Sequence, residues 1–374
     1  MKQIYLDNAA TTKLDPIVLE AMMPYLTENY GNPSSLYEIG INNKFAVNSA
    51  REKVAALIGA KPSEIYFTSG GSESDNWVLK TVPKGMHIIT SNIEHHAILH
   101  SCEWLKNNGI EITYVKVDKN GFVNPEDIEN AIKGNTYLIS IMFANNEIGA
   151  IQPIKEIGDI AKKHFIYFHT DAVQAFGHVP INVDDFGIDM LSCSSHKING
   201  PKGVGALYVR EGIFLPPYIH GGSQENNMRA GTENVPGIVG FGVAAELADN
   251  RMDDYHATTI RLMNRLIAGI KDIDDIHLNG SDVFRLTNNL NVRVGGVRGE
   301  ELETLLDMYG CYISTGSACN SSNNEPSHVL KAIGLTDDEA NSSIRITISS
   351  DLSDEDIDEF VEILKSCIAQ LRSR

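Results

Sequence analysis

The chain has 374 residues, of which 42% are apolar, so it is long enough and apolar enough to bury more than one core. Its formal net charge of −18 argues against a nucleic-acid-binding surface as the main function. Its apolar stretches are too short for a membrane span, and its five scattered cysteines form neither a disulfide framework nor a zinc-ligand pattern. We therefore expect a cytoplasmic globular protein that binds neither nucleic acid nor membranes.

The first two thirds of the chain alternate helical and strand-like patterns. Asp15 followed by Pro16 predicts the start of a helix with apolar residues on one face. Short runs rich in β-branched and aromatic residues then recur, and helical segments such as 153–163 separate most of them. The predicted strands span residues 64–68, 87–90, 112–117, 137–142, 166–169, 190–193 and 206–209. Apolar strands that alternate with helices predict an α/β fold with a mostly parallel central sheet, covered on both faces.

The pattern changes after residue 254. The predicted elements there are helices at 255–273, 300–308 and 354–371 and strands at 289–294 and 343–349. Ser353 and Asp356 have the spacing of a capping box for the last helix, and the polar stretch 314–326 predicts a loop. We interpret residues 15–254 as a large ligand-binding domain, and residues 1–14 together with 255–374 as a smaller α+β domain.

A small, polar motif follows the first predicted strand of this large domain: Thr68-Ser69-Gly70-Gly71-Ser72-Glu73. Because it opens a predicted helix, its backbone N–H groups and the Ser72 hydroxyl could face an anion. An ordinary strand-to-helix turn has the same composition. The motif alone therefore leaves a phosphate site as a hypothesis.

Two further predicted strands end close to residues that could take part in a reaction. Asp171 lies at the carboxyl end of its predicted strand, where open α/β sheets bind ligands. A carboxylate that is buried there needs a cation as its partner, such as a protonated pyridine nitrogen. Lys197 follows another strand in a small, glycine-rich setting that would leave its amine open to form a Schiff base. A helix N-cap aspartate and a surface lysine are the alternatives, and each is the commoner case for an isolated residue.

A histidine and a cysteine complete the candidates. His95, in Glu94-His95-His96, could act in acid–base chemistry or lie over an aromatic ring. A metal site is disfavoured because adjacent histidines point in different directions. Cys319 lies in the polar predicted loop, where exposure and mobility suit a reactive thiolate better than the buried, inert cysteine that is usual elsewhere.

Together these motifs resemble the cysteine desulfurases of the NifS/IscS type, within the class V aminotransferase fold family. The resemblance runs essentially from end to end. Its other motifs are Tyr5-Leu6-Asp7-Asn8-Ala9-Ala10-Thr11-Thr12, Gly31-Asn32-Pro33-Ser34-Ser35, Asn145-Asn146-Glu147-Ile148-Gly149, Ser195-His196-Lys197, Arg229-Ala230-Gly231-Thr232-Glu233-Asn234 and Gly316-Ser317-Ala318-Cys319. It implies a fold like that of aspartate aminotransferase and other pyridoxal-phosphate-dependent transferases, with the cofactor in the large domain and the cysteine loop in the small one.

The resemblance also implies an activity. A homodimer would convert L-cysteine to L-alanine and carry the sulfur as a persulfide on Cys319. An acceptor protein in iron–sulfur cluster assembly, or in tRNA or cofactor thiolation, would then receive that sulfur. No metal bound by the chain itself is implied, apart from a transient contact of a cluster with the Cys319 persulfide.

Each matching residue acquires a role by the same resemblance. Lys197, Cys319 and His95 would be catalytic, with Lys197 holding pyridoxal phosphate as a Schiff base. The cofactor would be bound by Gly71, Ser72, His95, Asn146, Asp171, Gln174, Ser194, His196, Lys197 and, from the neighbouring subunit, Thr232. Asn145 and Arg345 would bind the substrate, Arg345 as a bidentate clamp on its carboxylate.

Two alternatives stay open. A small-amino-acid aminotransferase or a selenocysteine lyase of the same fold would share Lys197 and Asp171 but would not need a cysteine on a loop. A non-catalytic sulfur- or cluster-handling adaptor would be expected to lack Lys197. The chain also departs from relatives that serve a cluster scaffold, because residues 224–227 are less basic and no longer tail follows Arg374. The identity of the sulfur acceptor is therefore left open.

Overall fold

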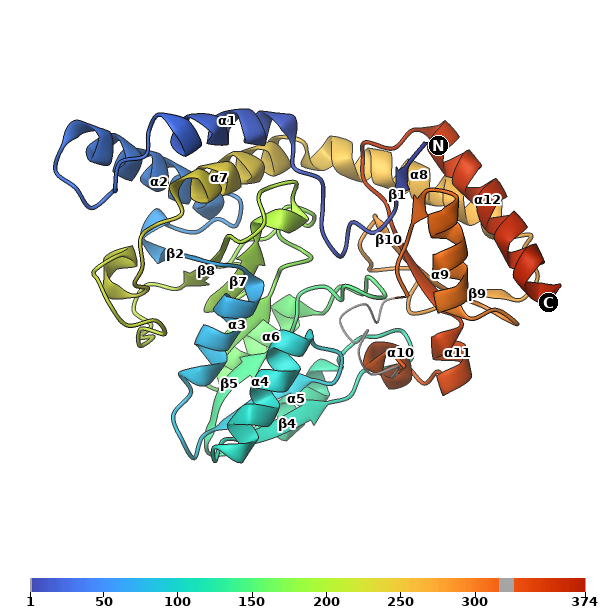
Figure 1. Cartoon of the computed structure of the whole chain (residues 1–374). Helices are drawn as coiled ribbons and strands as arrows, with labels where there is room; N and C mark the ends of the chain where they lie inside the picture. The colour runs from blue at the N-terminus through green and yellow to red at the C-terminus, as the bar shows by residue number, and fades with distance from the viewer. Residues whose placement is uncertain (1, 316–325, 374) are drawn as a thin grey trace.

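The computed structural model describes residues 2–315 and 326–373. Its central element is a seven-stranded sheet (Figure 1). From edge to edge, the strands are β2 (Ile65–Thr68), β8 (Gly205–Val209), β7 (Met190–Ser194), β6 (Tyr167–Asp171), β5 (Thr136–Ser140), β3 (His87–Ser91) and β4 (Glu111–Val115). All neighbours pair in parallel except β8, which is antiparallel to both β2 and β7. The predicted mostly parallel sheet is confirmed.

Helices cover both faces of this sheet. On one face lie α3 (Gly71–Lys80) and α4 (His96–Asn107), which bury Trp77 and Ile98 against the strands. On the other face lie α2 (Glu38–Ala56), α5 (Pro125–Ala131), α6 (Ile154–Lys163) and α7 (Val235–Asn250), with α1 (Pro16–Thr27) packed on α7. Strands β3, β7 and β8 are buried along their whole length, as expected for strands covered on both faces, whereas the edge strand β4 is mostly half-buried.

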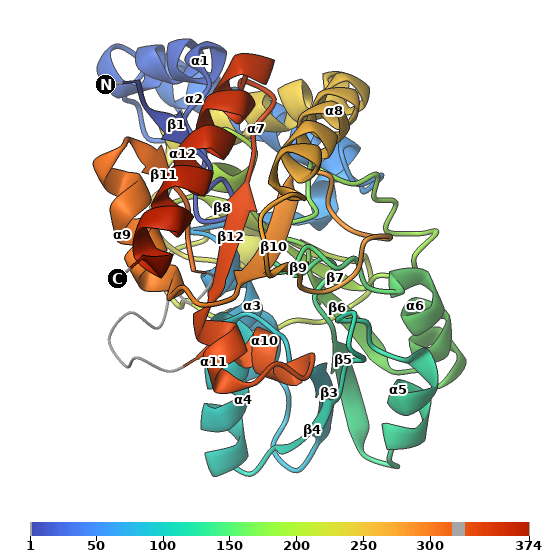
Figure 2. The same cartoon turned by 90° about the vertical axis from the view of Figure 1, so that its right-hand side faces the viewer.

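A second core is built from the two ends of the chain. Strands β9 (Ile276–Leu278), β10 (Asn289–Val294) and β12 (Ser343–Thr347) form an antiparallel sheet, and helices α8 (Met252–Ile270), α9 (Gly299–Met308) and α12 (Asp354–Arg372) pack with it (Figure 2). The N-terminal strand β1 (Ile4–Tyr5) pairs in parallel with β11 (Cys311–Tyr312), and Leu6 is buried in this core. We propose the division into residues 15–254 and residues 1–14 with 255–374 from this separation of cores.

Two short helices join the parts. Helices α10 (His328–Ala332) and α11 (Asp337–Asn341) bury Leu330 and Ala340 against Ile93 and Met142 of the large part. At the start of α12, Ser353 Oγ accepts a hydrogen bond from Asp356 N, and Asp356 accepts one from Ser353 N, so the predicted capping box is confirmed. Within the described ranges, no helix is both long enough and apolar enough to cross a membrane.

Candidate active site

A cavity of about 270 Å³ lies at the carboxyl ends of β6 and β7, close to the lower end of the volumes of small-ligand sites. Every predicted site residue lines it except Asn145, Thr232 and Cys319. The lining residues are Ala9, Ala10, Gly71, Ser72, Asp75, His95, Met142, Ala144, Asn146, Asp171, Val173, Gln174, Ser194, His196, Lys197 and Arg345. The structure thus brings together residues from the first tenth of the chain, the sheet and β12.

A larger cavity of about 600 Å³ lies nearby, where residues 13–16 meet the junction of α7 and α8. None of the predicted site residues lines it. The smaller cavity is the stronger candidate because it collects an amine, buried carboxyls and a guanidinium. Burial raises the pKa of its carboxyls Asp75 and Asp171, and carboxyls with shifted pKa values cluster at functional sites.

Asp171 and Lys197 define the chemistry of the smaller cavity. Asp171 ends β6 and is buried, and its Oδ1 accepts a hydrogen bond of 2.9 Å from Val173 N. Burial raises the pKa of Asp171 to about 6, although the Val173 N–H and Lys197 both favour its charged form. The Lys197 amine follows the end of β7 and donates to the carbonyl oxygens of Ala9 and Ala10 at 2.5 and 2.8 Å. The cavity therefore holds a buried carboxyl that a cationic ligand atom would ionise.

The first turn of α3 forms an anion cradle. Its N-cap, Gly70, has φ of 152°, a conformation that side-chain-bearing residues rarely adopt, and offers no side-chain cap. A Cβ at Gly71 would come within 2.5 Å of Val173 Cγ2, so only glycine fits there. The uncapped N–H groups of this turn and the cavity-lining Ser72 suit a phosphate.

His95 is held as a neutral side chain with a defined tautomer. It is the N-cap of α4, and its Nδ1 accepts a hydrogen bond of 3.1 Å from Ala97 N, which leaves the proton on Nε2. Burial lowers the pKa of His95 to about 4, and the charges of Lys197 and His100 lower it further in the same direction. At neutral pH the ring can therefore donate a proton from Nε2 only.

Arg345 is a buried guanidinium with an unsatisfied donor. It lies on β12 with 3% of its surface exposed, and its Nη2 donates to Asp7 Oδ1 at 2.7 Å. Its Nη1 donates to Asn146 O at 3.3 Å, and its Nε has no hydrogen-bond partner among the residues that the structure describes. A buried, unsatisfied donor on a cavity-lining cation is suited to a carboxylate ligand.

The N-terminal arm, residues 7–12, forms one wall of the cavity, which the sequence analysis did not predict. Besides holding Lys197, the Ala9 carbonyl accepts a hydrogen bond of 3.0 Å from Gln174 Nε2. The Thr11 hydroxyl contacts His196 Nδ1 at 3.1 Å, and burial lowers the pKa of His196 to about 4. The small and polar residues 7–12 after β1 could have indicated a functional segment, but sequence periodicity could not show which residues they contact.

Three predicted site residues are not in this cavity. The Asn145 side chain is buried in its own turn, where it donates to Ile93 O and accepts from Glu147 N and Ile148 N. Thr232 is exposed on a separate surface pocket of about 70 Å³. Cys319 lies outside the described residues. The structure of one chain therefore leaves the predicted roles of these three as proposals.

Known proteins share this arrangement over the whole chain. Residues 4–360 match the family Aminotransferase class-V. The chain is 55% identical over 377 residues to "Cysteine desulfurase IscS" of Methanosarcina thermophila, a match that covers 100% of this chain and 93% of that protein. Its fold matches that of a solved "NIFS-like protein" with a TM-score of 0.93 and 38% identity, over 99% of this chain and 100% of the other.

A second solved structure, "SspA in complex with cysteine", matches with a TM-score of 0.80 and 38% identity, over 93% of this chain and 99% of the other. The resemblance inferred from the motifs is confirmed, and so is the fold class. The chain belongs to the class-V aminotransferase family and, within it, to the cysteine desulfurases.

Proposed function

We propose that the chain uses pyridoxal phosphate to remove sulfur from L-cysteine, releasing L-alanine and leaving a persulfide on Cys319. One observation carries the proposal: a single cavity is lined by the Lys197 amine, the buried Asp171 carboxyl and the buried Arg345 guanidinium. The conversion balances without an outside oxidant or reductant. The Cβ–S bond of the substrate breaks, an S–S bond forms on Cys319, and Cβ takes up a proton.

The cavity residues fit pyridoxal phosphate. The uncapped first turn of α3 suits its phosphate, Asp171 suits a protonated ring nitrogen, and Lys197 suits its aldehyde. When bound, the cofactor supplies an electron sink for bond breaking next to Cα of the substrate. We assign the phosphate to Gly71, Ser72, Ser194 and His196, the phenolic oxygen to Gln174, the ring face to His95 and a pocket wall to Asn146.

We assign the substrate carboxylate to Arg345. Arg345 lines the cavity, Asp7 holds its Nη2, and its buried Nε has no hydrogen-bond partner among the described residues. A bidentate pair fixes orientation as well as adding affinity. Arg345 would therefore decide which bond of the substrate faces Lys197 and His95.

His95 is suited to donate a proton at Nε2. The neutral ring has one N–H, and the fixed Nδ1 contact orients it. A neutral donor beside a lysine amine can hand on a proton without adding a second positive charge to the cavity. We infer that His95 and Lys197 share the proton transfers at the substrate.

The assignment of Cys319 as sulfur carrier rests on its motif. It is supported by the state of the other cysteines: Cys102, Cys193, Cys311 and Cys367 are all buried. Burial raises the pKa of Cys102 to about 12 and that of Cys311 to about 11, so neither forms the thiolate that attacks sulfur at neutral pH. The persulfide would pass to an acceptor protein in the cytoplasm, for iron–sulfur cluster assembly or for thiolation.

We also infer a homodimer. Helices α1 and α2 both pack against α7 at one end of the molecule (Figure 1), and with the segment between them they expose many large apolar side chains. These are Ile17, Leu19, Met23, Leu26, Tyr30, Leu36, Tyr37, Ile41 and Phe45, with Leu36 92% exposed. Apolar surface on this scale is typical of subunit contacts. A second copy would also explain how Thr232, exposed on its own chain, could act in a phosphate site.

The first experiment locates the cofactor. Purified protein should be yellow and should release alanine and sulfide from L-cysteine. Borohydride reduction followed by peptide mapping should find the cofactor on Lys197. Cofactor found on Lys202 instead would overturn the assignment of the site.

The second experiment locates the sulfur. Mass spectrometry after incubation with L-cysteine should find one added sulfur on the peptide that contains Cys319. The Cys319→Ser variant should stay yellow but release no sulfide, whereas Cys102→Ala, the matched control, should release it normally. Sulfide release by Cys319→Ser at the wild-type rate would overturn Cys319 as the sulfur carrier and would favour a lyase of the same fold. Absence of sulfide release from the wild type would favour an aminotransferase.

A further inference from the structure

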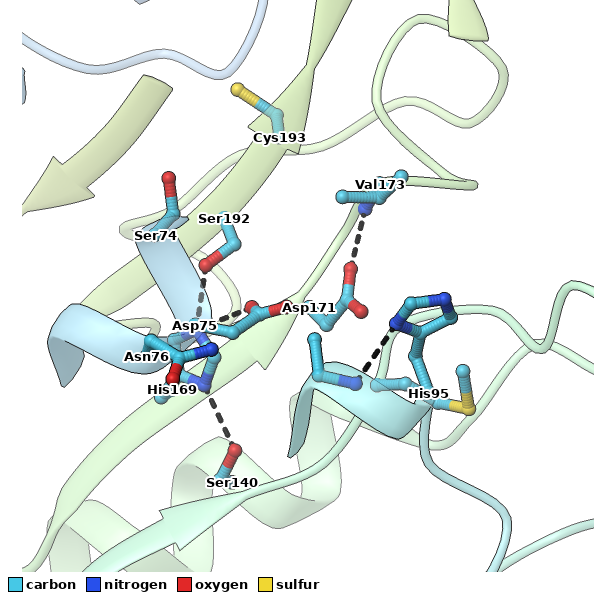
Figure 3. Close-up of polar contacts among 12 residues, drawn as sticks. Ser74, Asp75, Asn76, His95, Ser140, His169, Asp171, Val173, Ser192 and Cys193 are labelled. Carbon is cyan, nitrogen blue, oxygen red and sulfur yellow. Dashed lines mark hydrogen bonds and ion pairs between the residues drawn. The ribbon is translucent and has the colours of Figure 1, made fainter. Parts of the chain in front are cut away.

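A row of polar side chains crosses the buried face of the large sheet behind Asp171 (Figure 3). Ser140 on β5, His169 on β6 and Ser192 on β7 are each at most 1% exposed. Ser140 Oγ lies 2.8 Å from His169 Nδ1, and Ser192 Oγ lies 3.0 Å from His169 Nε2. Because His169 and Asp171 are two residues apart on one strand, the row and Asp171 share a face of the sheet. This face is the one that α3 covers.

Asp75 of α3 connects this row to the cavity. It is 1% exposed, and its Oδ1 lies 3.7 Å from His169 Nε2. Its carboxyl also interacts with the Ser192 hydroxyl, yet Oδ1 has no hydrogen-bond partner in the described part of the chain. Asp75 and Asp171 line the same cavity. An orphaned oxygen on a fully buried carboxyl is a poor place for negative charge and a suitable place for a proton.

The surrounding charges also favour a neutral Asp75. Burial raises the pKa of Asp75 well above its ordinary value, and repulsion from Asp171 and Glu94 raises it further against the opposing effect of the Ser192 hydroxyl. His169 cannot balance the charge, because burial lowers its pKa to about 3. Among the residues that the structure describes, no cation contributes to the pKa of Asp75.

Asp171 is the member of the pair that ionises more easily. Its pKa is raised only to about 6, since the Val173 N–H and Lys197 both stabilise its charged form. Two buried carboxyls that share a site do not both ionise without a balancing cation, so one proton is retained. Glu94 is protonated at neutral pH on the same grounds, because burial raises its pKa to about 8.

We propose that Asp75 is a positioning residue that retains a proton beside Asp171, so that the pair carries one negative charge, on Asp171. This rests on the proposed function, in which Asp171 faces the ring nitrogen of the cofactor. The row can support this arrangement. With the His169 proton on Nε2, the ring accepts from Ser140 and donates to Ser192 Oγ, so the Ser192 hydroxyl donates to Asp75 and Oδ1 is left to carry the proton.

The protonation state can be measured without reference to the cofactor. Infrared spectra of the purified wild-type protein and of Asp75→Asn at pH 7 should differ by the C=O band of a protonated carboxyl, which the variant lacks. The matched control is Asp358→Asn, an exposed residue whose pKa is lowered by its partner Arg265, and it should remove no such band. Absence of the band from the Asp75 difference would overturn the inference even if cofactor binding and activity are as proposed.

Cofactor affinity tests the positioning role. Asn has the size and neutrality of a protonated Asp, whereas Ala lacks both polar atoms. We therefore expect Asp75→Ala to weaken pyridoxal phosphate binding about tenfold, and Asp75→Asn to restore most of the affinity. Asp171→Asn should weaken it more than either.

Two outcomes of the binding measurement would contradict the proposed positioning role of a protonated Asp75. If Asp75→Asn binds as weakly as Asp171→Asn, Asp75 is itself a charged partner of the ligand. If Asp75→Ala binds as tightly as the wild type, Asp75 has no positioning role. Failure of the wild type to bind pyridoxal phosphate would instead overturn the proposed function and would leave the infrared result standing.

Discussion

The two walls of the cavity are held in different ways. On the sheet wall, Asp171 and Ser194 end adjacent parallel strands, and backbone pairing between β6 and β7 fixes their positions. On the arm wall, residues 7–12 and Arg345 come from segments far apart in sequence. The Asp7 side chain binds Arg345, and the arm backbone pairs with Thr347 of β12 at one isolated bridge. We conclude that the sheet wall places each group independently, whereas the arm wall is a set of mutual contacts. Loss of one sheet residue should therefore remove one function, and loss of one arm residue should displace its partner.

Lys197→Ala gives the largest expected effect, because the amine has no substitute on either wall. We expect kcat for sulfide release to fall by more than about 10⁴-fold, beyond the usual effect of losing one proton-transferring group. The fold should persist, since the side chain is only partly buried. Steady-state kinetics with circular dichroism would check this. A kcat reduced only tenfold would show that another residue can replace the lysine.

Arg345→Ala removes the guanidinium of the arm wall, which we assign to the substrate carboxylate. Removing one member of a buried charge pair typically costs several kcal/mol, so KM for L-cysteine should rise about 100-fold while the cofactor stays bound. Arg345→Lys keeps the charge without the planar fork and should recover only part of the loss. An unchanged KM in both variants would move the substrate carboxylate elsewhere in the cavity.

Asp7→Ala tests whether the arm residues depend on one another. Arg345 would lose its one carboxylate partner at 2.7 Å, so we expect KM to rise about tenfold with little change in kcat. Asp15→Ala is the matched control, because Asp15 pairs with Arg251 outside the cavity. Equal kinetics for Asp7→Ala and the wild type would contradict the idea of mutual support.

The smallest effect concerns the stability of the sheet wall. Glu94 is fully buried, and burial raises its pKa to about 8 from an ordinary value near 4.5. Its contribution to stability is therefore fully present below about pH 4.5 and is lost as the pH rises through about 8. Glu94→Gln stays neutral. Relative to the wild type, its free energy of unfolding should therefore rise by about 3 kcal/mol between pH 5 and pH 8.

Urea unfolding of both proteins at several pH values measures this gain. The exposed Glu111 is the matched control, because Lys133 lowers the pKa of that carboxyl, and Glu111→Gln should show no such gain. A constant difference between Glu94→Gln and the wild type from pH 5 to pH 8 would mean that Glu94 is ionised in the fold.

The sheet wall was largely predictable from the sequence, whereas the arm wall was not. Asp171 and Lys197 follow apolar runs, and strand ends in an open α/β sheet meet at one edge, so local pattern was enough to bring them together. The contact of Asp7 with Arg345 joins residues 338 positions apart and leaves no local trace. Arg345 was assigned to the substrate through the family resemblance alone.

Asp75 was missed for a different reason. It lies one helical turn after Ser72, so the 3.6-residue period already placed it on the cavity side of α3. The sequence of this helix has an ordinary amphipathic pattern, however, and a single aspartate in such a helix does not indicate a functional site. Thr232 could not be placed by any local pattern, because its proposed role needs a second chain.

The pairing of the two chain ends also sets the order in which the molecule can be made. The Asn8 side chain donates to Thr347 O across 339 positions of the sequence, and β1 pairs with β11. A ribosome adds roughly 5–20 residues per second, so the arm waits roughly 20 seconds to a minute for its partners to be synthesised. Until then Arg345 and Thr347 do not yet exist, so the cavity lacks its guanidinium and the arm lacks its partner on β12. Cofactor loading on the nascent chain is therefore expected to come after the last strand is released, however early the large sheet folds.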